Sequence, residues 1–215
     1  INNSFIDPIR ISYPYNASLD FKRIQEKKVE FNRDFDLSIA YFDEKFFGED
    51  KNDYECTASF FYEDLKYEIQ LLLKAAQSNP RLAIIFKSKY VNNSIIQLIS
   101  RDSDLRSLYN SSQIFDLVQY SKINTRNLIS PAEVGKISDI CIGNSWGGTA
   151  CYEAASVGCR SVLIKSTLSV YDDLLPPNIL FNSLDDIFVE LNKCSFNRDK
   201  LNESDLGLFN IDELI

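Results

Sequence analysis

The sequence predicts an α/β fold: a Rossmann-like, mostly parallel sheet covered by helices on both faces. Short apolar runs alternate with segments of helical period from Leu37 to Ile164, which is typical of repeated strand–helix–strand units. The clearest unit is SDICIGNSWGGTACYEAASVGCRSVLIK, residues 138–165, in which a glycine-containing turn joins an apolar run to a helical pattern. Parallel strands need crossover connections, and the crossover helices cover the two faces of the sheet.

The first elements of the domain are two apolar runs with a helix between them. Residues 37–42 (LSIAYF) predict a buried strand, and residues 61–78 predict an amphipathic helix. Residues 82–86 (LAIIF) predict a second strand after the break at Asn79-Pro80. The alternation expected of a parallel sheet begins here.

The next elements continue the same order. Residues 92–109 have a helical pattern with an interruption near 100–103, and residues 114–118 predict a third strand. Residues 130–133 (SPAE) combine a capping serine, a first-turn proline and an acidic residue, so a helix is expected to begin there. This helix leads into the fourth strand, which precedes the glycine turn.

The flanking segments differ from this domain, which we place at residues 37–195. Residues 1–36 predict a connection from a preceding domain, with a charged helix around 18–31. A helix is expected at 184–194, and residues 196–215 are expected to form an acidic C-terminal tail. Because the chain contains no methionine, we expect it to be a fragment that lacks an N-terminal domain.

Composition limits the function further. The net charge of -8 disfavours nucleic acid as a partner, and no stretch approaches the roughly 18 apolar residues of a membrane-spanning helix. The absence of histidine excludes Ser-His or Cys-His nucleophilic sites and His-ligated metal sites from these residues alone. Five cysteines without a C-x-x-C spacing favour reduced, buried thiols and a cytoplasmic protein.

The candidate ligand site lies where the strands end, because ligands of open α/β sheets bind beyond the carboxyl ends of the strands. The predicted edge carries polar residues after each strand: Asp43 and Glu44, Lys87 and Lys89, Gln119 and Tyr120, and residues 143–149. Lys87 and Lys89 beside a glycine-led helix start predict a clamp for phosphate, since helix N-termini attract anions. The alternatives are that these lysines are solvated strand-end charges, that Gly147 and Gly148 serve tight packing, and that Glu153 is a plain first-turn carboxylate.

The turn matches neither the P-loop nor the dinucleotide fingerprint, but it resembles a different nucleotide-binding region. The residues at 139–143, 147–150 and 153–158 resemble the donor-binding region of glycosyltransferases with the GT-B fold. They are also similar to the corresponding region of UDP-N-acetylglucosamine 2-epimerases. The strand end IIFKSK, residues 84–89, resembles the Lys-Pro-His or Lys-Pro-Lys element of bacterial transferases that build capsule and lipopolysaccharide. The resemblance covers roughly residues 37–195.

The resemblance implies one half of a GT-B fold, the C-terminal half that binds a nucleotide-sugar donor. It implies that Gly147, Gly148 and Thr149 meet the donor phosphates, that Glu153 meets the ribose, and that Lys87 meets a phosphate or donor carboxylate. We also expect Lys89, Gln119 and Ser145 to line the donor site. The catalytic residues stay unassigned, and neither a metal nor a cofactor is expected.

The same resemblance implies partners and a location. A glycan or lipid-linked acceptor would bind to the missing N-terminal domain, and the protein would be cytoplasmic or held at the inner membrane through the rest of its sequence.

The sequence departs from the family patterns at two positions. Ser145 occupies the place of the first glutamate of the E-x7-E pattern of retaining families, and Ser88 replaces the proline of the lysine element with no histidine after it.

Two other functions stay open from the sequence. One is an enzyme like the UDP-N-acetylglucosamine 2-epimerases, although the chain has no histidine. The other is a domain that binds a nucleotide sugar without turning it over. A second Rossmann-like domain upstream in the full-length protein would favour the transferase over this binding module.

Overall fold

The computed structural model describes residues 21–43, 46–47, 60–87, 94–110, 114–116, 130–145, 149–166 and 175–209. Within them a six-stranded sheet has the order β5-β4-β1-β6-β7-β8, and every neighbouring pair is parallel. The strands of this sheet are β1 (Leu37–Phe42), β4 (Leu82–Lys87), β5 (Ile114–Asp116), β6 (Ile140–Asn144), β7 (Arg160–Ile164) and β8 (Leu180–Phe181). The short strands β2 (Phe46–Phe47) and β3 (Phe60–Phe61) form a separate parallel pair. The predicted parallel α/β sheet is confirmed.

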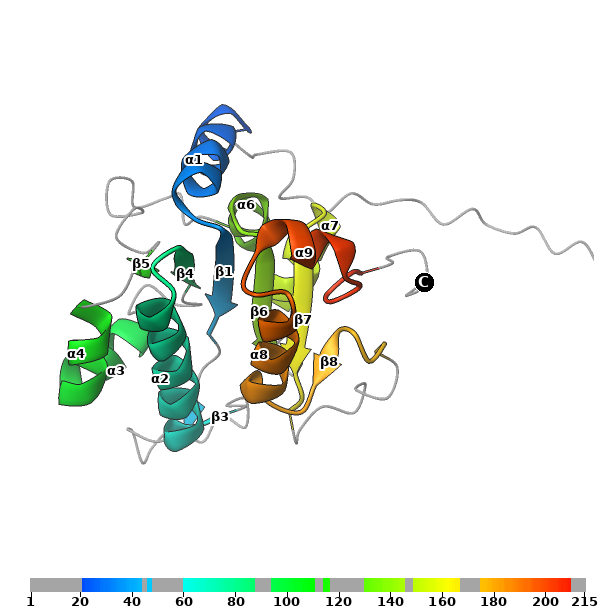
Figure 1. Cartoon of the computed structure of the whole chain (residues 1–215). Coiled ribbons are helices and arrows are strands. Elements are labelled where there is room, and N and C mark those ends of the chain that lie inside the picture. The colour runs from blue at the N-terminus through cyan, green and yellow to red at the C-terminus, as the bar shows by residue number, and fades with distance from the viewer. Residues whose placement is uncertain are drawn as a thin grey trace, which may run out of the picture.

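Helices cover both faces of the sheet, as Figure 1 shows. The described helices are α1 (Phe21–Asp34), α2 (Tyr62–Ser78), α3 (Ser94–Arg101), α4 (Ser103–Asn110), α6 (Pro131–Ile137), α7 (Thr149–Ser156), α8 (Leu184–Lys193) and α9 (Arg198–Glu203). Helices α2, α3, α4, α8 and α9 bury apolar residues in one core cluster, and α1, α6 and α7 do so in a second cluster. Alternate residues of the central strands enter the two clusters, Ile39 and Tyr41 one and Ala40 and Phe42 the other. The strands are therefore buried on both faces, as their continuous apolar runs predict.

The strand order reverses between β1 and β6. The chain passes from β1 outward through β4 to β5, returns to β6 on the other side of β1, and continues outward through β7 to β8. This is the doubly wound order in which ligands bind outside the carboxyl ends of the two strands at the reversal. The topology thus marks the β1–β6 edge, at the bottom of Figure 1, as the first place to look for a site.

Local polar residues determine where several helices begin. The Ser130 side chain accepts a hydrogen bond from the Glu133 amide at 3.2 Å, and Glu133 accepts one from the Ser130 amide at 2.7 Å, a capping box that confirms the predicted start of α6. The expected interruption lies between α3 and α4. There Asp102 accepts hydrogen bonds from the amides of Asp104 and Leu105 at 2.9 and 3.0 Å, which ends one helix and begins the next.

The segment expected to be a C-terminal tail packs on the core over part of its length. The Asn197 side chain caps α9 by accepting from the amides of Asp199 and Lys200. Leu201 and Leu206 are buried in the core cluster formed by α2, α3, α4, α8 and α9. Leu201 and Leu206 of this segment are therefore core residues, whereas Leu208 is exposed.

None of the helices within the described ranges has the length and the apolar character that crossing a membrane requires.

Candidate functional site

The ends of β1 and β4 bring opposite charges to the carboxyl edge. Asp43 follows β1 directly and is buried, with a relative exposure of 4%. Its amide donates a hydrogen bond to the carbonyl of Lys87, the last residue of β4, at 3.3 Å. The two neighbouring strands therefore end together, with an acidic and a basic side chain at the same level of the sheet.

Lys87 is half-buried at this edge and interacts with two carboxylates. Burial lowers the pKa of Lys87, while the charges of Asp43 and Glu153 act in the opposite direction, so that the net pKa is below its ordinary value. Glu153 belongs to α7, which follows β6. The electrostatic coupling shows that residues from three separate parts of the sequence come together at the β1–β6 edge.

The end of β6 is closely packed against α7. A Cβ atom on Gly143 would lie 2.7 Å from the Sγ atom of Cys151, so only glycine lets α7 approach the strand this closely. Asn144, the last residue of β6, is buried at 3% exposure. The close approach positions the first turn of α7 over the carboxyl end of the sheet.

Ser145 is placed at the predicted edge but makes structural contacts. Its amide donates to the Ile164 carbonyl at 2.9 Å, and its Oγ accepts from the Ser166 amide at 2.9 Å. These bonds join the ends of β6 and β7. Ser145 therefore holds the start of the β6–α7 turn in place.

Thr149 and Glu153 lie one helical turn apart on α7. Thr149 is the first residue of the helix and is exposed, which leaves its hydroxyl at the helix N-terminus. Glu153 is half-buried, with its Oε2 atom fully buried. The positive end of the helix dipole and a carboxylate therefore occur together beside Lys87.

The structure brings together some of the predicted site residues. Lys87 and Glu153 meet electrostatically, and Ser145 and Thr149 flank the turn between β6 and α7. Lys89, Gln119, Gly147 and Gly148 lie outside the described residues, so their roles stay predictions.

A further cation at this edge was missed from the sequence. Lys165 directly follows β7 and is exposed, and its amide donates to the Phe181 carbonyl of β8 at 2.7 Å. It lies one residue before Ser166, which bonds to Ser145. The sequence held a signal, because Lys165 follows an apolar run as Lys87 does. The order of the strands was needed to place Lys165 near the end of β6.

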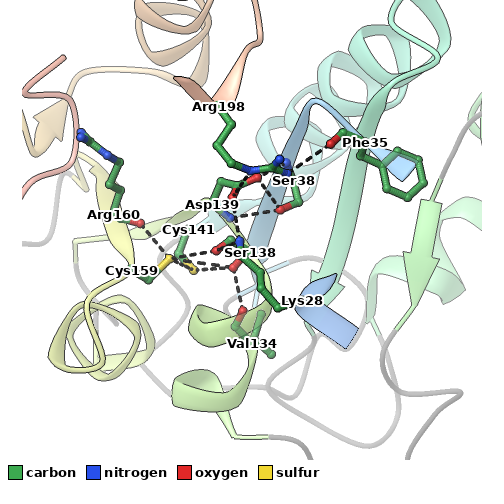
Figure 2. Close-up of polar contacts among 10 residues, drawn as sticks. All are labelled: Lys28, Phe35, Ser38, Val134, Ser138, Asp139, Cys141, Cys159, Arg160 and Arg198. Atoms are coloured by element: carbon green, nitrogen blue, oxygen red, sulfur yellow. Dashed lines mark hydrogen bonds and ion pairs between the residues drawn. The ribbon is translucent and has the colours of Figure 1, made fainter. Parts of the chain in front are cut away.

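A second polar cluster lies at the opposite, amino edge of the sheet (Figure 2). Oδ1 of Asp139 accepts from Nζ of Lys28 at 2.6 Å and from Nε of Arg198 at 2.8 Å, and Oδ2 accepts from the amide and hydroxyl of Ser38, both at 2.8 Å. Burial by itself would raise the pKa of Asp139, but Arg198 and Lys28 outweigh it and hold that pKa below its ordinary value. Both carboxylate oxygens of Asp139 thus accept two hydrogen bonds each, from groups of α1, β1 and α9. Asp139, part of the motif that carried the resemblance, therefore has a structural role.

Comparisons of the chain with protein-family models, with curated proteins and with solved structures found no match. The functional argument therefore depends on the carboxyl edge itself. There the strand order reverses, α7 begins shortly after β6, and the charges of Asp43 and Glu153 act on Lys87.

Proposed function

We propose that this chain is the donor-binding half of a glycosyltransferase with the GT-B fold, which transfers a sugar from a nucleotide donor during assembly of a surface glycan. One observation carries the proposal: the β6–α7 turn that resembles the donor-binding motif follows the strand at which the sheet order reverses. In doubly wound sheets a nucleotide binds at this position. The sequence resemblance and the strand order therefore both support a nucleotide site at the carboxyl end of β6.

In this function the edge supplies charge complementarity to a nucleotide diphosphate. The amides at the start of α7 and the ammonium of Lys87 would face the phosphates, and Glu153 would accept hydrogen bonds from the ribose hydroxyls. When the glycosidic bond to the donor breaks, negative charge develops on the leaving phosphate. Fixed donors at that position stabilise the charge without the need to reorganise, and this is the main rate effect we assign to the site.

The acceptor and the catalytic base belong, in this proposal, to a second Rossmann-like domain. The acceptor is a glycan or a lipid-linked glycan, and the enzyme acts in the cytoplasm or at the inner membrane. The carboxylates of this edge, Asp43 and Glu153, then serve binding and positioning. No metal is assigned to the step.

Calorimetry against UDP, GDP, CDP and CMP and their sugar conjugates tests the proposal. We expect one nucleotide class to bind, and Lys87→Ala to weaken that binding by about 1–3 kcal/mol, the range for a charge-assisted hydrogen bond. Lys193→Ala is the matched control, because Lys193 is an exposed lysine on α8 that pairs with Glu190. Equal affinities for the wild type and both variants would refute the site.

A second substitution tests the helix start. Gly148 lies outside the described residues, but its position in the sequence predicts that a side chain there blocks the approach of a phosphate. We expect Gly148→Val to abolish nucleotide binding with little change in the thermal midpoint. If Gly148→Val instead unfolds the domain while Lys87→Ala leaves affinity unchanged, the glycines are structural and the donor site is wrong.

A further inference from the structure

Two cysteine sulfurs lie in contact on the face of the sheet that α6 and α7 cover, next to the cluster around Asp139 (Figure 2). Sγ of Cys141 in β6 and Sγ of Cys159, the residue before β7, are 3.5 Å apart, and both thiols are free. A disulfide needs about 2.05 Å between the sulfurs, so an approach of about 1.5 Å would join them. We propose that Cys141 and Cys159 form a reversible disulfide when the protein meets a peroxide.

The surroundings assign different roles to the two sulfurs. Both residues are buried, but Cys141 has no exposed surface whereas Cys159 as a whole residue is 8% exposed, so Cys159 is the nearer of the two to solvent and to a small oxidant. Burial and the neighbouring Cys159 raise the pKa of the Cys141 thiol well above its ordinary value, which keeps it protonated. Cys159 is therefore the sulfur that is oxidised, and Cys141 is the sulfur that resolves the product.

Ser138 orients the resolving thiol. Its Oγ donates a hydrogen bond to the Val134 carbonyl at 2.7 Å and lies 3.3 Å from Sγ of Cys141. Because the hydroxyl hydrogen is donated to Val134, the Ser138 Oγ accepts a hydrogen bond from the Cys141 thiol, which keeps its proton. The lone pairs of the Cys141 sulfur are then available to Cys159.

The reaction balances in two steps. Cys159 sulfur attacks one oxygen of hydrogen peroxide, the O–O bond breaks, and water leaves with the thiol proton, which gives a sulfenic acid. Cys141 sulfur then attacks the Cys159 sulfur, the S–O bond breaks, and hydroxide leaves with the Cys141 proton as a second water. In total, the two thiols lose two protons and two electrons, and one peroxide is reduced to two waters.

The disulfide would close a loop between residues 18 apart in sequence, and this loop contains the β6–α7 turn and α7. Oxidation would thus clamp the candidate site unit covalently and restrict the unfolded chain. The proposal is independent of the proposed function, because it requires only the two thiols and a peroxide.

Peptide mapping of the folded, peroxide-treated chain under non-reducing conditions tests the proposal. We expect a linked peptide pair containing Cys141 and Cys159, an intact mass lower by two hydrogen atoms, reversal by dithiothreitol, and a thermal midpoint raised by a few degrees. Cys159→Ala should abolish the link, while Cys141→Ala should leave Cys159 to proceed to the sulfinic acid. Cys151→Ala is the matched control, because Cys151 is equally buried on α7 and its substitution should leave the link intact.

The wild-type map decides the question even if a variant fails to fold. Oxidation that stops at the sulfinic acid of Cys159, or thiols that react only after denaturation, would overturn the proposal. A disulfide that includes Cys56, Cys151 or Cys194 in place of the pair would overturn it as well.

Discussion

Glu68 is a buried carboxyl group whose charge the fold does not favour. It lies on α2 with 7% exposure, and the Tyr41 hydroxyl of β1 donates to its Oε2 at 2.5 Å. Burial raises the pKa of Glu68 to about 7, against the lowering effect of the Tyr41 bond, and the nearby carboxylates Asp64 and Asp185 add to the increase. Between pH 4.5 and about 7, the Glu68 side chain is therefore mostly protonated in the folded chain and mostly ionised in the unfolded chain.

This pKa predicts a stability that falls as the pH rises. The contribution of Glu68 to the free energy of unfolding is fully present below its ordinary pKa of 4.5. This contribution is lost as the pH rises through about 7. The difference between the folded and the ordinary pKa of Glu68 corresponds to a loss of about 3 kcal/mol in the free energy of unfolding. We expect Glu68→Gln, which keeps the shape and remains neutral, to remove this loss and to exceed the wild type in stability at pH 8.

Urea unfolding at pH 5 and pH 8 measures the effect. Glu63→Gln is the control, because Glu63 lies on the same helix and is exposed, so it should change stability little at either pH. A difference between Glu68→Gln and the wild type that is equal at the two pH values would show that ionisation of Glu68 does not govern the dependence.

At the scale of elements, α7 packs closely against α6 and β6 because glycines face it on both. A Cβ on Gly135 of α6 would lie 2.9 Å from Cα of Ala154, and a Cβ on Gly143 of β6 would lie 2.7 Å from Sγ of Cys151. Contacts this short require atoms to move, because packed interiors leave little free space. Helix α7 therefore approaches both α6 and β6 more closely than larger residues would allow.

We expect Gly143→Ala to lower the free energy of unfolding by about 1–3 kcal/mol through overpacking. Because the Cys151 sulfur is the clashing atom among the described residues, Cys151→Ala in the same chain should recover part of the loss, with a coupling of about 0.5–3 kcal/mol in a double-mutant cycle. Gly158→Ala is the matched control. Among the described residues no atom lies within 4 Å of its added Cβ, and its φ is +87°, so its cost comes from the backbone and should be independent of Cys151.

Additive effects of Gly143→Ala and Cys151→Ala would contradict this account of how α7 docks.

The elements that the sequence predicted correctly are those with local causes. The start of α6 follows from Ser130 and Glu133, three residues apart, and the break before α4 follows from Asp102 and its neighbours. The apolar runs predicted strands because both faces of those strands are buried. Local patterns of this kind are complete within a few residues.

The parts that the sequence did not reveal depend on distant partners. α9 is short and charged, and it is held by Leu201 in the core and by Arg198, whose partner Asp139 is 59 residues away. In the same way, the bonds of Ser145 to Ile164 and Ser166 depend on the pairing of β6 with β7, and its expected place in the donor site stays a prediction. Such contacts cannot be found until the strand order is known.

At the scale of the whole molecule, Asp139 joins segments from both ends of the described chain. Its carboxylate has 6% exposure and pairs with Lys28 of α1 and Arg198 of α9. We expect Asp139→Asn to lower the free energy of unfolding by about 2–4 kcal/mol, because it leaves two cations without their counter-charge. In hydrogen-exchange measurements, the amides of α1 and α9 should show the largest increase in exchange rate relative to the wild type.

The exposed pair of Arg81 and Asp36 is the control for this measurement. Both side chains are well exposed, so Asp36→Asn should cost less than about 1 kcal/mol. If the two substitutions had equal effects, the Asp139 cluster would not be the connection that we infer.

The last prediction concerns what the 215-residue chain does by itself. In the proposed function the acceptor and the base are supplied by a second domain, whereas the groups that face the donor lie at the β1–β6 edge. We therefore expect this chain to bind one class of nucleotide or nucleotide sugar weakly and to transfer no sugar. Calorimetry and a radiolabelled-donor assay on the same preparation measure the two properties together, so that failure to fold cannot imitate lack of transfer. Sustained turnover by this chain would place the base within these residues and would contradict the division of roles, because positioning and charge stabilisation at one edge would then suffice for the whole reaction.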